Sequence, residues 1–135
     1  MAMLIGIGLD LVDIERIQRI VTREETSFIR LLLSERELHL YEQLRAPRRR
    51  TEWLSGRFAA KEAASKAFGT GLSSVVTPKS LEILPDSLGK PELMIPAVLV
   101  NQYKEPIRSH VTITHTKHTA AAVVMIERIE AVINH

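Results

Sequence analysis

The amino-acid sequence predicts an α+β fold with a largely antiparallel sheet and one long helix, in a single domain covering residues 1–135. Apolar residues recur at helical spacing in the first half of the chain, whereas the second half alternates apolar and polar residues as strands do. An alanine-rich run, GRFAAKEAASKAFGTG from Gly56 to Gly71, predicts the long helix and its end. With 135 residues, 45% of them hydrophobic and 25% charged, the chain can bury a core.

The first elements follow from apolar periodicity. The run Leu4–Leu9 predicts a buried strand, interrupted by Gly6 and Gly8, where we expect another backbone or a ligand to come close. From Val12 onward, apolar residues recur every three to four positions and predict an amphipathic helix. The helical pattern continues over Phe28–Leu33.

Capping signals mark the next two helices. The segment Ser34–Glu37 has the S-x-x-E pattern of a capping box and predicts a helix to about Leu44. The segment Ala46–Arg50 breaks this pattern. Thr51 is the expected cap of the long helix, which runs to Phe68.

The second half of the chain predicts four strands with turns between them. The expected strands are residues 81–84, 93–95, 111–115 and 120–126, the turns are 85–91 and 116–118, and a short helix is expected over 97–103. No internal repeat or linker indicates a second domain. The glycine-rich first strand and the apolar last strand would expose more edge than these helices can cover, so we expect sheets of different subunits to associate.

Composition restricts the function. The chain has no cysteine, which excludes disulfides, thiolate catalysis and zinc sites built on sulfur. A net charge of +2 only weakly favours an anionic ligand or an acidic partner and does not specify nucleic acid. The first residues lack a basic region and soon reach Asp10 and Asp13, so neither a signal peptide nor a membrane span is expected, and the location is predicted to be cytoplasmic.

One face of the long helix carries candidate catalytic groups. Helical spacing places Glu62 and Lys66 one turn apart, on the face of Phe58, Ser65 and Gly69. Taken alone, such a pair is usually an exposed ion pair that stabilises the helix. Its small neighbours also leave room for a large ligand.

Asp10 follows the first strand and has two interpretations. It is either a helix cap or, together with Glu62, a ligand of a hard cation. One or two carboxylates with open coordination positions suit Mg²⁺, which completes its shell with water and phosphate oxygens.

Other candidate motifs are weaker. Gly6-Ile7-Gly8 lacks the third glycine of a dinucleotide-binding motif, and no Gly-Lys-Ser/Thr follows Gly69-Thr70-Gly71, as a P-loop requires. The run Arg48–Arg50 is either a solvated loop or a phosphate site. His115 is either a core histidine or a ligand contact.

Five blocks of sequence, in this order, resemble one protein family closely. They are Gly6-Ile7-Gly8-Leu9-Asp10, Arg57-Phe58-Ala59-Ala60-Lys61-Glu62-Ala63, Ser65-Lys66-Ala67-Phe68-Gly69-Thr70-Gly71, Gly89-Lys90-Pro91 and Thr112-Ile113-Thr114-His115-Thr116. The family is the holo-acyl-carrier-protein synthases, the small bacterial class of 4′-phosphopantetheinyl transferases. Each block is weak by itself, but the set spans nearly the whole chain.

The resemblance implies an activity and an assembly. Members of this family transfer 4′-phosphopantetheine from coenzyme A to a serine of apo-acyl-carrier protein and release adenosine 3′,5′-bisphosphate, in support of fatty acid biosynthesis. The resemblance also implies a homotrimer with its active sites at the subunit interfaces.

The resemblance further assigns roles to residues. Asp10 and Glu62 match the family's metal ligands, and Lys66 matches the lysine that faces the phosphates. The positions that match coenzyme A contacts or basic residues near the nucleotide are Arg49, Arg57, Gly69, Thr70, Gly71 and His115.

The residue chemistry fits this reaction. Mg²⁺ on Asp10 and Glu62 would neutralise charge on the pyrophosphate, and Lys66 would stabilise the negative charge that develops during the reaction. Glu62, acting through a water, is our choice of base for the serine proton. A stripe of Arg16, Arg19 and Arg23 on the first helix is predicted to dock the acidic carrier protein.

Two other functions remain open on this evidence. One is a non-catalytic binding module for an acidic partner or nucleic acid, although three Phe, two Tyr and one Trp provide few stacking surfaces. The other is a different magnesium-dependent enzyme that acts on a nucleotide pyrophosphate.

Overall fold

The structure, a computed structural model, describes residues 2–69 and 76–129. Its elements, in chain order, are β1 (Ala2–Asp13), α1 (Ile14–Leu32), α2 (Glu35–Gln43), α3 (Pro47–Phe68), the 3₁₀ turn η1 (Pro78–Ser80), β2 (Glu82–Pro85), β3 (Pro91–Met94), α4 (Ala97–Val100), β4 (Ile107–His115) and β5 (Thr119–Ile129). This arrangement is the α+β fold that the sequence predicts.

Three long strands form an antiparallel sheet in the order β1-β5-β4, and β2 and β3 form a separate hairpin. The pairing of β1 with β5 runs from Ala2 opposite Ile129 to Asp13 opposite Thr119, with one irregularity between Leu4 and Gly6. The last strand was expected to leave an edge exposed, and that expectation is wrong. β5 is central and pairs on both sides, so the free edges belong to β1 and β4.

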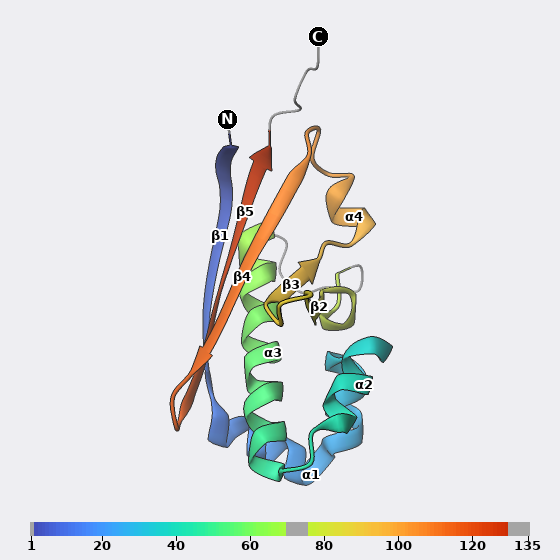
Figure 1. Cartoon of the computed structure of the whole chain (residues 1–135), viewed down its shortest axis with the longest axis vertical. Helices are drawn as coiled ribbons and strands as arrows, with labels where there is room; N and C mark the ends of the chain where they lie inside the picture. The colour runs from blue at the N-terminus through green and yellow to red at the C-terminus, as the bar shows by residue number, and fades with distance from the viewer. Residues whose placement is uncertain (1, 70–75, 130–135) are drawn as a thin grey trace.

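All the helices and the hairpin lie on one side of the sheet (Figure 1). The helix α3 runs along this inner face and packs against β1 and β5, and its apolar contacts are largely made by alanines. Ala59, Ala60, Ala63 and Ala64 are fully buried. Alanines on a helix allow it to approach a sheet closely, so the long helix can lie near the backbone of the strands.

The outer face of the sheet is uncovered, and β1 lines it with large apolar side chains. Ile7, Leu9 and Leu11 are 59%, 56% and 65% exposed. They lie opposite Met125, Val123 and Ala121 of β5, so the apolar surface continues across two strands. An exposed apolar surface of this kind marks an interaction site.

Two helix boundaries differ from the expectation. Val12 was expected to open a helix, but it pairs with Ala120 and is buried, so β1 extends to Asp13, whose side chain caps α1. The long helix begins at Pro47, four residues before Thr51, because proline is well suited to a first helical position. Arg48–Arg50 therefore lies in a helix and not in a loop.

The second half follows the expected order with adjusted boundaries. The strand expected over 111–115 begins at Ile107, and the helix expected over 97–103 ends at Val100. Ser34 and Glu37 form the predicted capping box at the start of α2.

A buried ion pair joins several elements beneath α3. The ammonium of Lys61 (1% exposed) lies 2.6 Å from a carboxylate oxygen of Glu37 (0% exposed) and also donates to the carbonyls of Leu32 and Pro78. The other Glu37 oxygen accepts from the backbone N–H of Ile83. This network ties α1, α2, η1 and β2 to the long helix.

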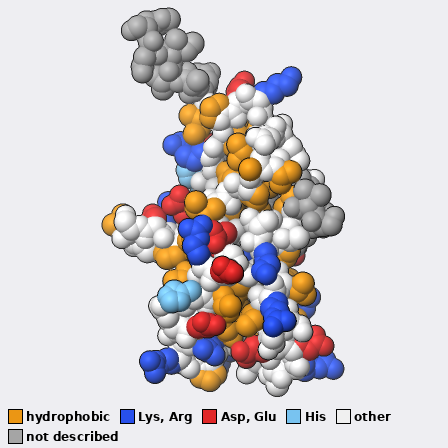
Figure 2. All heavy atoms as spheres, turned by 90° about the vertical axis from the view of Figure 1, so that its right-hand side faces the viewer, with side chains coloured by type: hydrophobic (Ala, Val, Ile, Leu, Met, Phe, Trp, Pro, Cys, Tyr) orange, Lys and Arg blue, Asp and Glu red, His pale blue; other side chains and the backbone are white. Residues whose placement is uncertain are grey.

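The helical face of the molecule carries charges of both signs (Figure 2). Acidic and basic side chains are interspersed over its lower part, as expected from a net charge of only +2. None of the helices in the described parts of the chain is both long and apolar enough to cross a membrane.

Candidate active site

Two glycines of β1 let the backbone of α3 come into direct contact with the strand. A Cβ atom at Gly6 would lie 2.1 Å from the carbonyl oxygen of Ala67, and one at Gly8 would lie 1.9 Å from that of Ala63. The expectation that another backbone approaches these glycines is therefore confirmed. Asp10 is the next residue on the same face of the strand, so this contact brings it beside α3.

Asp10 meets Lys66 at this crossing. The Lys66 ammonium lies 3.1 Å from Asp10 Oδ1 and 3.1 Å from the carbonyl oxygen of Leu9. The two partners are 56 residues apart in sequence. For Glu62 and Lys66 taken alone, the sequence left open an ion pair along the helix. The structure instead places the ammonium on Asp10.

Glu62 lies within the electrostatic reach of the same groups. Partial burial, and then the negative charge of Asp10, raise the pKa of the Glu62 carboxyl above its ordinary value. Lys66 and Arg16 act in the opposite direction. A bound cation would offset the effect of Asp10 on Glu62 and favour the carboxylate form of Glu62.

The donor set fits a hard divalent cation. Asp10 and Glu62 offer carboxylate oxygens, and the described residues contain no group of three or more Asp, Glu, His or Cys that could hold a metal. A site with two protein ligands leaves coordination positions for water and phosphate, which is the arrangement Mg²⁺ prefers. These two residues would hold the ion.

The predicted basic stripe lies on α1 beside this site. Arg16, Arg19 and Arg23 are all exposed, while Ile14 and Ile17 on the opposite side of the helix are buried. The Arg16 guanidinium lies over the Phe58 ring of α3, 5.9 Å from its centre. The helix is kinked at Glu24, directly after Arg23, so the stripe ends there.

A second basic group lies nearer the start of α3. The Arg57 guanidinium stacks on Trp53, 4.5 Å from the ring centre, and burial lowers its pKa, with nearby Arg49 acting in the same direction and Glu37 opposing. Arg57 Nε is buried and has no hydrogen-bond partner within the described chain. A phosphate at this end of the helix would supply the missing acceptor and the missing charge.

His115 is not a core residue. It is exposed, and its Nε2 lies 3.0 Å from Glu52 of α3. Arg48 also approaches Glu52, at 4.0 Å, and donates to the Lys117 carbonyl. The end of β4 and the start of α3 thus form one basic corner. Sequence reasoning missed Glu52, although its position four residues after Arg48 was a usable signal.

The predicted glycine segment is described only in part. Gly69 ends α3 with φ +73°, the left-handed conformation that favours glycine. Thr70 and Gly71 lie outside the described residues.

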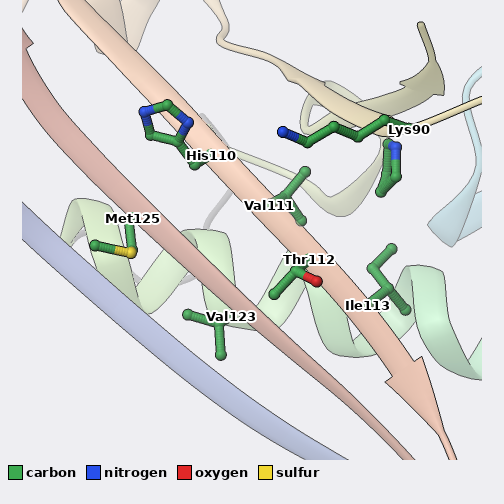
Figure 3. A pocket seen from close by; sticks show the side chains of 8 residues that line it. Lys90, His110, Val111, Thr112, Ile113, Val123 and Met125 are labelled. Carbon is green, nitrogen blue, oxygen red and sulfur yellow. The ribbon is translucent and has the colours of Figure 1, made fainter. Parts of the chain in front are cut away.

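A hollow of about 330 Å³ lies where the β2–β3 turn meets β4. In Figure 3 the Lys90 side chain points from the β2–β3 turn toward β4 and His110. Thr112 and Ile113 also line it, so two of the five characteristic sequence blocks meet here.

The model of the 4′-phosphopantetheinyl transferase superfamily matches residues 6–125 of the chain. The chain belongs to this superfamily. The holo-[acyl-carrier-protein] synthases of a Geobacillus strain and of Bacillus subtilis are 42% and 41% identical to it. The alignments cover 94% and 96% of this chain and 99% and 100% of the relatives.

Solved structures of such synthases share the fold. The Bacillus anthracis enzyme, in complex with CoA (3′,5′-ADP), has a TM-score of 0.79 at 35% identity, over 94% of this chain and 99% of that one. The Helicobacter pylori enzyme, in complex with coenzyme A, has a TM-score of 0.77 at 27% identity, over 89% and 98%. This phosphopantetheinyl transferase therefore has the fold and the family membership that its sequence predicts.

Proposed function

We propose that this transferase moves 4′-phosphopantetheine from coenzyme A to a serine of apo-acyl-carrier protein and releases adenosine 3′,5′-bisphosphate. The observation that carries the proposal is the convergence of Asp10, Glu62 and Lys66 where β1 crosses α3. Relatives bearing the name of this activity align over nearly their whole length, and two related structures hold coenzyme A or its nucleotide.

Each residue has a task in this reaction. A divalent cation on Asp10 and Glu62, which we take to be Mg²⁺, would neutralise the charge of the pyrophosphate. Lys66 places an ammonium where negative charge develops as the phosphate bond breaks. Glu62 is our choice of base for the serine proton, acting through a water held at the cation.

The nucleotide is proposed to lie at the basic corner. Arg49 and Arg57 would bind its phosphates, and His115 would contact it from the end of β4. The unpaired Nε of Arg57 supports this assignment, because a buried donor without an acceptor is costly unless a ligand supplies one. Gly69, Thr70 and Gly71 complete the proposed coenzyme A contacts.

Mass spectrometry of apo-carrier protein incubated with coenzyme A and Mg²⁺ tests the function. We expect the carrier protein to gain the mass of one phosphopantetheine. Cleavage of coenzyme A without protein modification would instead indicate a nucleotide pyrophosphatase, and binding without either change would indicate a non-catalytic module.

The carrier protein is proposed to dock on Arg16, Arg19 and Arg23. Arg16→Glu and Arg19→Glu should each raise the KM for carrier protein by about tenfold or more, because like charges face each other across an interface. The KM for coenzyme A should hardly change for Arg19→Glu, the residue farther from Phe58. A carrier-protein KM that stays at the wild-type value in low salt would show that α1 is not the docking surface.

We also propose that the enzyme works as a homotrimer whose subunits meet on the uncovered face of the sheet. The apolar side chains of β1 support this association, and the number three rests on the resemblance to the family. Light scattering on the purified protein tests it, since an active monomer would contradict an active site between subunits.

A further inference from the structure

Lys66 already neutralises one of the two carboxylates of the proposed metal site. Its ammonium lies 3.1 Å from Asp10 Oδ1, and the Leu9 carbonyl holds it in place from the same strand. It also acts on the second carboxylate, since its charge opposes the rise in the pKa of Glu62. A protein cation thus lies against Asp10, one of the two carboxylates that the divalent ion would use.

We infer that the Lys66 ammonium and the divalent cation compete for the Asp10 carboxylate, so that Lys66 lowers the affinity of the site for metal. The inference rests on the proposed function, which assigns Asp10 and Glu62 to the metal. Two cations cannot both approach one carboxylate oxygen without repelling each other, so binding of one weakens binding of the other.

Lys66 is free to leave Asp10, as this competition requires. Its side chain is 54% exposed, and the ammonium ends a flexible four-carbon chain that can reach other partners in the open site. The neighbouring Lys61 shows the opposite case, because it is 1% exposed and held by three acceptors. Of these two lysines on α3, Lys66 can exchange the group that accepts from its ammonium, and Lys61 cannot.

The new partner of Lys66 would be a phosphate oxygen of the substrate. Once a divalent ion holds Asp10, the displaced ammonium faces the anion that the same ion binds, and a phosphate is a good acceptor for it. Competition therefore keeps the charge of Asp10 paired without metal and moves a positive charge to the substrate when the metal binds.

Titration with Mn²⁺, followed through the paramagnetic resonance of the free ion at low salt, tests the competition without substrate or turnover. Lys66→Met should bind Mn²⁺ about two- to fivefold more tightly than the wild type, which is the effect of one partly exposed ion pair. Lys66→Arg keeps the charge and should bind like the wild type. Lys79→Met, which removes one exposed charge from η1, is the matched control and should also bind like the wild type.

Two results distinguish a failure of the inferred competition from a failure of the proposed metal site, provided that circular dichroism shows each variant to be folded. If Asp10→Asn loses Mn²⁺ but Lys66→Met binds it no more tightly than the wild type, the competition is refuted and the metal site stands. If Asp10→Asn binds Mn²⁺ as well as the wild type, the proposed metal site is wrong. The inferred competition is then refuted as well.

Discussion

At the scale of single residues, the carboxyl group of Glu62 is subject to opposing influences. Burial and Asp10 favour its protonated form, whereas Lys66 and Arg16 favour the carboxylate, and the first two prevail because the pKa is raised. The sequence pointed to Asp10, Glu62 and Lys66 as candidates, but it did not predict the contact of Lys66 with Asp10. Such a pairing depends on the crossing of two elements and leaves no periodic signal in the chain.

Glu62→Gln should make the protein without divalent metal more stable at neutral pH. A carboxyl whose folded pKa exceeds its unfolded value near 4.5 binds its proton more tightly in the folded state, so stability is lost as the pH rises through the folded pKa. The amide removes that loss. Thermal unfolding should therefore show a higher Tm for Glu62→Gln at pH 7 and nearly equal values well below pH 4.5.

The magnesium response provides the control for this variant. Added Mg²⁺ should raise the Tm of the wild type and have little effect on Glu62→Gln, since binding to the folded state stabilises it. A wild-type Tm above that of Glu62→Gln at pH 7 without metal would contradict the proposed repulsion between Asp10 and Glu62.

The buried pair of Lys61 and Glu37 should be important for stability. Lys61→Met leaves the Glu37 carboxylate buried without its counter-ion and should lower the free energy of unfolding by about 3–5 kcal/mol. The double variant Lys61→Met/Glu37→Leu should recover part of this loss, because no charge then remains buried. Urea denaturation measures both, and equal losses in the single and double variants would argue against an unpaired charge as the cause.

At the scale of elements, the close crossing of β1 over α3 was accessible from the sequence, whereas several boundaries were not. Gly6 and Gly8 indicated a close approach, and the alanine run indicated a helix that could make it. The early part of β4 was missed because Ser109, on the inner face, interrupts the alternation of apolar and polar residues. Arg108 and His110 lie on the outer face, where both contact Glu127. The true start of α3 was missed because Thr51, inside the helix, has the side chain of a typical cap.

Gly8→Ala should separate the strand from the helix and disturb the site. The new methyl group would meet the Ala63 carbonyl at 1.9 Å, and because backbone atoms cannot move aside easily, we expect a loss of about 3 kcal/mol or more in stability. Gly56→Ala is the matched control on α3. Its methyl group meets one side-chain atom, the Cγ2 of Ile113, at 2.9 Å and no backbone atom of another described element, and alanine favours a helix by about 1 kcal/mol over glycine.

Thermal and urea unfolding of both glycine variants measure the difference. A Gly8→Ala protein as stable as Gly56→Ala would mean that β1 and α3 can separate at little cost. In that case the crossing would not fix the distance between Asp10 and the carboxylate of Glu62.

At the scale of the whole molecule, the sheet is covered on one side only (Figure 1). From the sequence we expected subunits to associate through the sheet because strand edges would be exposed. The structure adds an uncovered apolar face, which can be recognised only when the register of β1 and β5 is known.

Ile7→Glu should prevent the association of subunits and leave each subunit folded. Ile7 is 59% exposed in the single chain, so a charge there costs little until a second sheet covers it. Leu88→Glu, at a residue 92% exposed on the turn between β2 and β3, introduces the same charge away from this face. Light scattering should give a smaller mass for Ile7→Glu alone, with loss of transfer activity, and an unchanged mass would show that the outer face is not the interface.

The order of the strands also has a consequence for synthesis on the ribosome. β5 is the middle strand, and it is the last described element to be translated, whereas its partner β1 is the first. At the usual speed of translation, β1 therefore waits on the order of ten seconds for its partner. During that interval the helices can form locally, but the apolar residues of β1 have no strand to pair with. A nascent chain of this kind depends on rapid release, or on a chaperone, to protect its first strand until the last one emerges.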